Sequence, residues 1–416
     1  MRVLNALANR VGIRGYQPGI WVAVGIQAIR TTGFSISFTY LPLYLYQQRH
    51  VSMTLVGSVL LISGIVSGFA QVGGGILADR FGHRRTFVFF QTADILLFAM
   101  LAVLVGVNGP VWSILLMSAA VTAAGGLSMP AVSAIIAGAS EETRLTESFG
   151  LMAIGFSVGW SIGPLTGGFL QSFTSYAWVF ATGALVTSLS LIALPHLPRG
   201  TKAIAQDPSS QKLGVFMVNS NLLVFCAICM FFYIEMGQWG STLSIFTVDR
   251  IGFSPEQYGL LLSIASVLIV VFQHPVSRRI ERLGLRRSLF LGSLLYGMGF
   301  LSFSWVRSFV PALGSIIVLV AGEMLFVPAA YAVVGKIARP EDRGKSMGLL
   351  GLCGALGSSC GPLLGGVLLD RFALDPFYVW GPVALPAFLA AGGFALWRKY
   401  GRAEAAVSTK ITASEQ

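Results

Sequence analysis

Two long stretches of this chain, 111–138 and 346–369, contain no charged residue. Each is longer than the about 20 apolar residues that cross the hydrocarbon core of a bilayer as a helix. Only 11% of the 416 residues are charged and 55% are hydrophobic, whereas a typical soluble domain has roughly 25% charged residues. These values exclude a soluble enzyme and a disordered scaffold, and they indicate a helical protein that crosses a membrane many times.

Hydropathy predicts an all-α integral membrane protein with 12 transmembrane helices. The spans are expected near 19–46, 54–77, 86–107, 111–138, 147–171, 175–196, 219–248, 256–277, 288–306, 309–337, 345–370 and 375–397. One polar, turn-rich stretch of some length, 197–218, separates the sixth span from the seventh. We therefore predict an N-terminal six-helix bundle (1–196), a linker (197–218), a C-terminal six-helix bundle (219–397) and a tail (398–416).

Lys and Arg are spread unevenly over the predicted loops. If the N-terminus is cytoplasmic, the cytoplasmic segments hold 23 of the 28 Lys and Arg residues and the outside loops hold four: Arg49, Arg250, Arg307 and Arg371. Because short cytoplasmic loops carry the excess of positive charge, both termini are expected in the cytoplasm and the protein in the cell (inner) membrane. The net charge of +11 then faces anionic lipid headgroups, so nucleic acid is not an expected partner.

The two halves of the chain repeat each other. Residues 79–85 (DRFGHRR) recur as 281–287 (ERLGLRR) at an offset of 202, and 163–168 (GPLTGG) recur as 361–366 (GPLLGG) at an offset of 198. An even number of spans in each half gives both halves the same orientation. We therefore predict two pseudo-symmetric six-helix bundles related by an axis along the membrane normal.

The loop between the second and third predicted spans reads GILADRFGHRR over residues 75–85. Gly75 allows another helix to approach, and Gly82 permits a turn. Asp79 can lie at the positive N-terminal end of a neighbouring helix, and the arginines can bind carboxylates or lipid phosphates. Taken alone, the pattern also fits a loop that only anchors the topology.

This loop resembles the signature loop of the major facilitator superfamily. The resemblance implies a cytoplasmic latch that holds the two halves together and opens during transport, made by Gly75, Asp79, Arg80, Gly82, Arg84 and Arg85. The second copy keeps Glu281 and Gly284 but has Ser277 in place of the first glycine. The latch is therefore expected to be asymmetric.

The fifth predicted span carries GFSVGWSIGPLTGG over residues 155–168. Glycines four residues apart leave one helix face without side chains, and a proline removes a hydrogen bond inside the helix. The run resembles the antiporter motif of proton-driven exporters in that superfamily, with Gly159, Gly163, Pro164, Gly167 and Gly168 at the motif positions. Nearly the whole chain is most similar to the 12-helix drug:proton antiporter family, although helix packing alone would also explain these glycines.

One position departs from the family pattern. Many relatives carry an Arg twelve residues before a Pro in the fourth span, and counting back from Pro130 gives Ser118. That arginine is linked in the family to proton transfer, so its absence affects the coupling route. Arg30 in the first span is a candidate for the missing positive charge.

Four ionisable residues inside predicted spans are our candidates for proton coupling: Arg30, Asp94, Glu235 and Glu323. A charge near the bilayer centre costs about 2.5 to 3.5 kcal/mol on insertion scales, so such side chains face a cavity or a partner. An apolar interior favours a neutral carboxyl group, so either glutamate could exchange a proton for a cationic ligand. Alternatively, one glutamate is permanently paired with Arg30 and has a structural role. A structural role is also an alternative for Asp94, because the family places its span at the periphery.

The resemblance places spans 1, 4, 7 and 10 around a central cavity between the two bundles. The faces predicted to line it carry Gln27, Phe34, Ser37, Phe38, Tyr233, Gln238, Trp239, Phe326 and Tyr331. Aromatic walls with few polar groups suit lipophilic ligands and attract cations. Ordinary aromatic packing is the alternative explanation for these side chains.

These features together predict a proton-coupled exporter (antiporter) of lipophilic, cationic or zwitterionic small molecules that works by alternating access. The alternatives are an exporter of an endogenous sugar, lipid or siderophore, and a non-transporting membrane sensor. The sequence contains no G-x-x-x-x-G-K-[ST] nucleotide loop and no clustered nucleophile and base, so an enzyme is not predicted. Cys226 and Cys229 lack a His or acidic partner at ligand spacing, so neither metal nor cofactor is expected. We expect a monomer whose partners are its small-molecule substrate, protons and membrane lipids.

Overall fold

The structure is a computed structural model that describes residues 18–139, 145–197, 220–337, 343–372 and 375–397. Every regular element in these ranges is helical, which confirms the predicted all-α class. The predicted linker beyond Leu197 and the predicted tail lie outside the described residues.

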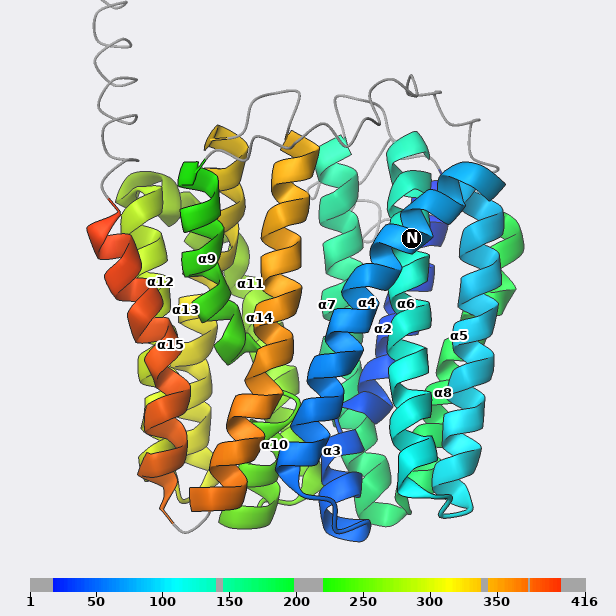
Figure 1. Ribbon diagram of the computed structural model, residues 1–416, viewed down its shortest axis with the longest axis horizontal. Helices are drawn as coiled ribbons and strands as arrows, with labels where there is room; N and C mark the ends of the chain where they lie inside the picture. Colours follow the sequence, from blue (N-terminus) through cyan, green and yellow to red (C-terminus); the bar gives the residue numbers. More distant parts are fainter. Residues whose placement is uncertain (1–17, 140–144, 198–219, 338–342, 373–374, 398–416) are drawn as a thin grey trace, which may run out of the picture. The chain divides into compact units, whose positions relative to one another are not determined.

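The helices follow the predicted spans in order (Figure 1). The first half contains α2 (Pro18–Phe38), α3 (Leu41–Leu43), the π-helical turn η1 (Tyr44–Gln48), α4 (Met53–Phe81), α5 (His83–Gly106), α6 (Val111–Ala139), α7 (Leu145–Phe173), α8 (Tyr176–Ala193) and the 3-10 turn η3 (Leu194–His196). The second half contains α9 (Ser220–Met236), α10 (Thr242–Ile245), the π-helical turn η5 (Phe246–Ile251), α11 (Pro255–Leu283), α12 (Leu285–Ser302), the 3-10 turn η6 (Phe303–Trp305), α13 (Phe309–Ile337), α14 (Arg343–Phe372) and α15 (Pro376–Leu396). Nine of the described helices are long and apolar enough to span a membrane, and α2, α7 and α9 stand where the first, fifth and seventh spans were predicted.

The first and seventh spans are not continuous, contrary to the prediction. The first is interrupted at 39–40 and the seventh at 237–241, and each break is followed by a short α-helix and a π-helical turn. Pro42, which lacks a backbone N–H, lies in the first turn of α3, and the second break contains two glycines. The turns η1 and η5 begin at Tyr44 and Phe246, which are separated by the offset of 202 found in the sequence repeat.

Contacts divide the chain into two compact units. One comprises 1–37 and 66–212, and the other comprises 38–65 and 213–416. Helix α4 therefore begins in the second unit and ends in the first. The sequence division placed 38–65 in the N-terminal bundle, whereas its contacts are with the C-terminal residues; the division at the linker stays a prediction.

In the first unit, α5 packs against both α6 and α8 (Figure 1). In the second unit, α12 packs against α13 and α15, and α9 packs against α14 and α15. Aromatic side chains fill the core of this second group, where the fully buried Trp380 stacks on Phe300 at a centroid distance of 5.7 Å and meets the edge of Phe246 at 5.0 Å. This packing fixes α12 and α15, which flank the buried carboxyl groups described below.

The same glycine packing occurs once in each unit. A Cβ atom added to Gly163 on α7 would lie 2.9 Å from the carbonyl oxygen of Thr32 on α2. A Cβ atom added to the equivalent Gly361 on α14 would lie 2.3 Å from the carbonyl oxygen of Ile234 on α9. Only glycine allows helices this close, so the sequence repeat corresponds to a repeat in three-dimensional packing.

Candidate functional site

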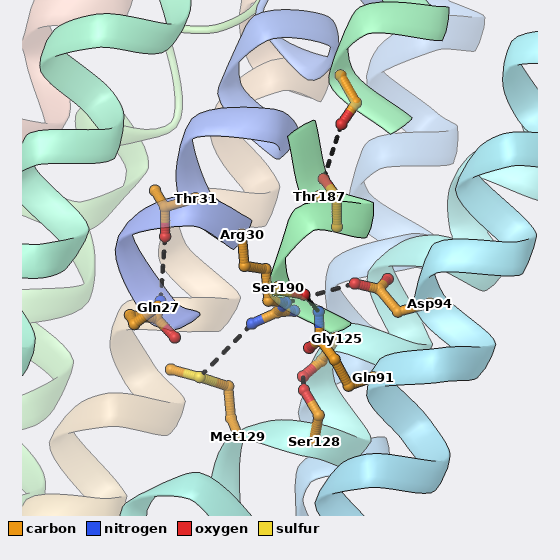
Figure 2. A network of polar contacts seen from close by, with 11 residues as sticks. Gln27, Arg30, Thr31, Gln91, Asp94, Gly125, Ser128, Met129, Thr187 and Ser190 are labelled. Carbon is orange, nitrogen blue, oxygen red and sulfur yellow. Dashed lines mark hydrogen bonds and ion pairs between the residues drawn. The ribbon is translucent and has the colours of Figure 1, made fainter. Parts of the chain in front are cut away.

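An ion pair crosses the interior of the first unit. Arg30 on α2 places its Nε 3.3 Å from Oδ2 of Asp94 on α5, and its Nη1 lies 4.0 Å from Sδ of Met129 on α6. Figure 2 shows the guanidinium pointing toward Asp94 among polar side chains from neighbouring helices. Both side chains are largely buried, with exposed fractions of 15% and 6%. Arg30 is thus paired with Asp94 in this structure, and not with a glutamate.

The space for this arginine is provided by a glycine. A Cβ atom added to Gly125 on α6 would lie 2.5 Å from Nη2 of Arg30. The pair does not use all of the carboxylate, because Oδ1 of Asp94 has no hydrogen-bond partner among the described residues. Asp94 therefore keeps a free acceptor in a region where an unpaired charge is costly.

Further polar contacts surround the pair (Figure 2). The amide of Gln91 on α5 donates to Oγ of Ser190 on α8 over 3.2 Å, and the amide of Gln27 donates to Oγ1 of Thr31 on α2 over 3.1 Å. The predicted cavity residue Gln27 is 4% exposed and lies in this network. The first unit therefore contains several separate polar contacts around the pair of Arg30 and Asp94.

Glu235 on α9 is fully buried in the second unit. Its Oε1 accepts a hydrogen bond of 2.9 Å from the backbone N–H of Ala387 on α15. Ala387 follows Pro386, a proline inside α15, and a proline inside a helix disturbs the local backbone hydrogen bonding. The carboxyl group thus satisfies a backbone donor of a neighbouring helix, while its Oε2 has no partner among the described residues.

Glu323 on α13 is half-buried. The residue before it, Gly322, packs against α12, where an added Cβ atom would lie 2.8 Å from the backbone nitrogen of Tyr296. Glu323 and Tyr296 therefore lie on the two helices that meet where α13 packs on α12. In the described part of the chain, neither glutamate forms an ion pair with Lys or Arg.

Aromatic rings pack beside these carboxyl groups. Phe326 stacks on Phe232 with centroids 3.6 Å apart, and Phe232 lies 4.5 Å from the ring of Tyr296. Tyr233 meets the edge of Phe326 at 6.1 Å. Of the predicted cavity residues, Phe326 is fully buried whereas Tyr331 is 46% exposed; their role in a cavity stays a prediction.

The break in the seventh span carries two predicted cavity residues, Gln238 and Trp239. Gln238 is fully buried and donates to the carbonyl oxygen of Gly361 over 2.9 Å, and its Oε1 accepts from the hydroxyl of Thr242. Trp239 donates its indole N–H to the hydroxyl of Tyr296 over 2.6 Å. Side chains therefore tie this break to α14 and α12.

The other predicted cavity residues of the first span lie in helix contacts or are half-buried. Ser37 is fully buried and donates to the carbonyl oxygen of Val179 on α8 over 3.2 Å. Phe34 and Phe38 are half-buried. Ser37 thus supports the packing of α2 on α8, and the cavity role of these three residues stays a prediction.

Two glycines of the antiporter motif, Gly159 and Gly163, lie where α7 meets α2. Oγ of Ser35 donates to the carbonyl oxygen of Gly159 over 3.0 Å. Gly163, Pro164, Gly167 and Gly168 are buried. The motif therefore fixes the packing of two helices within the first unit, and its link to export stays a prediction.

The loop predicted as a latch is mostly helical, with Gly82 as the break. Gly82 has a φ of +91°, a conformation that favours glycine. The close approach to α6 occurs at Gly74, where an added Cβ atom would lie 2.2 Å from the carbonyl oxygen of Leu127, and not at Gly75, where the nearest atom would be 3.9 Å away. The helix approach expected at Gly75 is thus made by its neighbour.

The arginines of this loop bind helix ends. Arg84 donates to the carbonyl oxygen of Pro195 over 3.0 Å, and the equivalent Arg286 donates to that of Phe394 over 2.9 Å and to that of Ala395. Cations near the carboxyl end of a helix are favourable. These two arginines therefore bind backbone carbonyl groups where carboxylates or phosphates were predicted.

The remaining latch residues are less constrained by contacts. The guanidinium of Arg80 lies 5.5 Å from the ring centroid of Phe81, and Arg85 is exposed. The side chain of Asp79 lies outside the described residues. The latch function itself stays a prediction.

A sequence profile described as the Major Facilitator Superfamily matches residues 23–254 and 236–412. The chain belongs to the Major Facilitator Superfamily. Members of the superfamily are multi-pass secondary transporters, and the chain is therefore one as well. The family resemblance read from the sequence is confirmed.

Relatives in the superfamily match along most of the chain. The "Uncharacterized MFS-type transporter YqjV" of Bacillus subtilis (strain 168) is 26% identical over 362 residues, covering 83% of this chain and 85% of the relative. "Multidrug resistance protein 1" of the same bacterium is 25% identical over 342 residues, covering 80% and 85%. The solved nucleoside transporter NupG shares the fold with a TM-score of 0.77 at 16% identity, covering 92% of this chain and 100% of NupG.

Some residues of the site were not found from the sequence. Tyr296 and Ala387 contact Trp239 and Glu235, but neither carries a charge or lies in a motif. Gly125 gives Arg30 its space, and the only signal for it was a glycine in the fourth span. Each of these residues contacts a partner that is far away in the sequence, so the contact becomes visible only once the fold is known.

Proposed function

We propose that this transporter exports lipophilic cationic or zwitterionic small molecules in exchange for protons, by alternating access. The observation that supports it best is a pair of carboxyl groups, Glu235 and Glu323, placed beside aromatic rings without a cationic partner among the described residues. A carboxylate in such a place attracts a cation strongly, and the rings suit a lipophilic one. The similarity to a protein named for multidrug resistance agrees with this cargo class.

We assign the exchange of protons for cargo to Glu323 first. Glu323 is half-buried, so that water and cargo can reach it, whereas Glu235 is fully buried and holds the backbone of α15. A proton arriving from outside neutralises Glu323, which removes the attraction for the cation and favours its release. Loss of that proton toward the cytoplasm restores the charge for the next cargo molecule.

Arg30 and Asp94 are assigned a second part in coupling. Arg30 supplies a buried positive charge in the first unit, in a chain that has Ser118 at the position of the family's arginine. The free Oδ1 of Asp94 is an acceptor that a proton can occupy. Protonation there would weaken the ion pair, so the pair is a candidate for a proton-dependent rearrangement of α2 and α5.

The remaining assignments concern placement in the membrane. Both termini are assigned to the cytoplasm of a cell with the protein in its inner membrane, because the basic loops then face the cytoplasm and anionic lipids. The latch loop that contains Gly82 lies on that side. The protein is assigned as a monomer.

The test is transport in proteoliposomes that carry a pH gradient, with ethidium as the cationic probe and glucose as a neutral probe. We expect ethidium transport that stops when an ionophore collapses the gradient, and that loses its dependence on the gradient in Glu323→Gln. Glu256→Gln, at the start of α11, is the matched control and should behave like the unchanged protein. Ethidium transport that survives the collapse, or gradient-driven transport of glucose alone, would overturn the proposal.

A further inference from the structure

Glu235 lies where two irregular helix segments meet. It is in the last turn of α9, which ends at Met236, and its backbone carbonyl accepts from the N–H of Gln238 over 2.9 Å at the start of the break in the seventh span. Its Oε1 accepts from the backbone N–H of Ala387 over 2.9 Å, next to one of the two prolines inside α15. The residue therefore binds backbone donors on both sides, each at a place where a helix is irregular.

The carboxyl group of Glu235 has little to stabilise a negative charge. The residue is fully buried, one hydrogen bond reaches Oε1, and Oε2 has no hydrogen-bond partner among the described residues. In the same part of the chain, Glu235 forms no ion pair with Lys or Arg. An uncompensated carboxylate in an apolar interior costs so much free energy that the group takes up a proton instead.

The surfaces that meet at this position are apolar. Phe232, one turn earlier on the same face of α9, stacks on Phe326 with centroids 3.6 Å apart. On α15, which packs on α9, Val383 and Ala384 are fully buried one turn before Ala387. The polar groups that α15 offers in this turn are consequently those of its backbone.

Pro386 leaves a backbone acceptor in the same turn of α15. Because a proline has no N–H, the carbonyl oxygen of Pro382, four residues earlier, lacks its helical donor. A neutral carboxylic acid has one O–H to donate and keeps an acceptor oxygen, whereas a carboxylate can only accept. A protonated glutamate can therefore serve both an N–H and a carbonyl group of a turn opened by proline.

We propose that Glu235 is a positioning residue that stays protonated and fastens the proline turn of α15 to the end of α9. Its carbonyl oxygen accepts from Ala387, and its O–H serves the carbonyl group that Pro386 leaves without a donor. The proton is part of the packing and is not exchanged during transport. The negative charge that the proposed function requires is then that of Glu323. The role of Glu235 goes beyond that function and does not depend on the cargo.

The first test is the infrared spectrum of the purified protein, in which the C=O stretching band of a protonated carboxyl group is separate from the bands of a carboxylate. The difference between the unchanged protein and Glu235→Gln should show a protonated carboxyl band that persists from mildly acidic to mildly alkaline buffer. Glu256→Gln, in the first turn of α11, is the matched control and should show the loss of a carboxylate in alkaline buffer. A carboxylate band for Glu235, or a protonated band that disappears as the pH rises, would overturn the inference.

The second test is the apparent unfolding temperature in detergent. Glu235→Gln keeps an acceptor oxygen and adds an N–H donor, so it should unfold at the temperature of the unchanged protein. Glu235→Leu keeps the bulk but leaves the N–H of Ala387 without an acceptor, and should lower that temperature by about 2 °C or more. A loss in Glu235→Gln as large as in Glu235→Leu, or no loss in either variant, would contradict the proposed bond.

The outcomes are distinguishable from those for the proposed function. If Glu235 gives a carboxylate band while Glu323→Gln is uncoupled from the pH gradient, only this inference fails. If Glu323→Gln transports ethidium with normal coupling while the protonated band of Glu235 persists, only the proposed function fails.

Discussion

Asp370 at the end of α14 is joined to Thr54 at the start of α4 by two hydrogen bonds, 2.7 Å from the backbone nitrogen and 2.6 Å from Oγ1. The same carboxylate accepts from the backbone nitrogen of Met53 over 3.0 Å. An acidic residue more than three hundred positions away in the sequence thus caps the N-terminus of α4. This cap is one reason why 38–65 groups with the C-terminal residues.

Replacing Asp370 with Ala should lower stability by about 1 kcal/mol, because the first N–H groups of α4 lose their acceptor. The apparent unfolding temperature of the protein in detergent measures the change. Asp249→Ala, which removes the ion-pair partner of Arg250, is the control and should change it less, because a single surface ion pair contributes little. Equal effects of the two substitutions would mean that the cap contributes little.

Gly125→Ala should destabilise the first unit by about 1 to 3 kcal/mol, because the new methyl group would occupy the space of the Arg30 guanidinium. Gly25→Ala on α2 is the matched control, since a Cβ atom there meets nothing within 4 Å. Thermal unfolding of both variants checks the prediction. A Gly125→Ala protein as stable as Gly25→Ala would show that the guanidinium has room to move.

Asp94→Asn should cost about 3 kcal/mol, because it leaves Arg30 without its ionic partner in the interior. Removing both charges, in Arg30→Gln with Asp94→Asn, should recover part of that loss. Denaturant unfolding of the single and double variants measures the difference. The prediction is wrong if the double variant is less stable than Asp94→Asn alone.

Arg286→Ala should lower stability by about 0.5 to 1 kcal/mol, because the last carbonyl groups of α15 lose their donor. Its exposed neighbour Arg287 gives the control, Arg287→Ala. Both are compared by thermal unfolding. No difference between the two would indicate that water replaces the arginine without loss.

Mild oxidation should join Cys226 to Cys353, because α9, which carries the first thiol, packs closely on α14, which carries the second. The experiment uses the protein with Cys229→Ser and Cys360→Ser, so that one disulfide is possible. Mass spectrometry of the digested protein should find the linked peptides. Their absence under conditions that oxidise free thiols would contradict the packing of these two helices.

Much of the fold was predictable because hydropathy and repeat offsets act along the chain. The tenth span was expected at 309–337, and α13 has these limits. The break at 237–241 was not predicted, because a hydropathy window averages over a short turn whose flanking residues are apolar. Gly237 and Gly240 are the residues in the sequence that could have indicated this break.

The partners of the buried charges could not be predicted in the same way. Arg30 and Asp94 are separated by 64 positions, and the sequence offered Glu235 and Glu323 as equally good partners for the arginine. Glu235 is instead bonded to a backbone N–H beside a proline, a donor that every segment of the chain offers. The sequence therefore identifies the ionisable residues that are costly to bury, whereas their hydrogen-bond and ion-pair partners are known only from the three-dimensional structure.

The paired π-helical turns, η1 and η5, show that the repeat extends to the irregular backbone. Both follow an interrupted span and begin at positions related by the repeat offset. A π-helical turn has wider i→i+5 hydrogen bonding than an α-helix, so each half widens its first span at the same register. Deleting one residue from either turn would therefore rotate the following helix relative to its counterpart in the other half and break the pseudo-symmetry there.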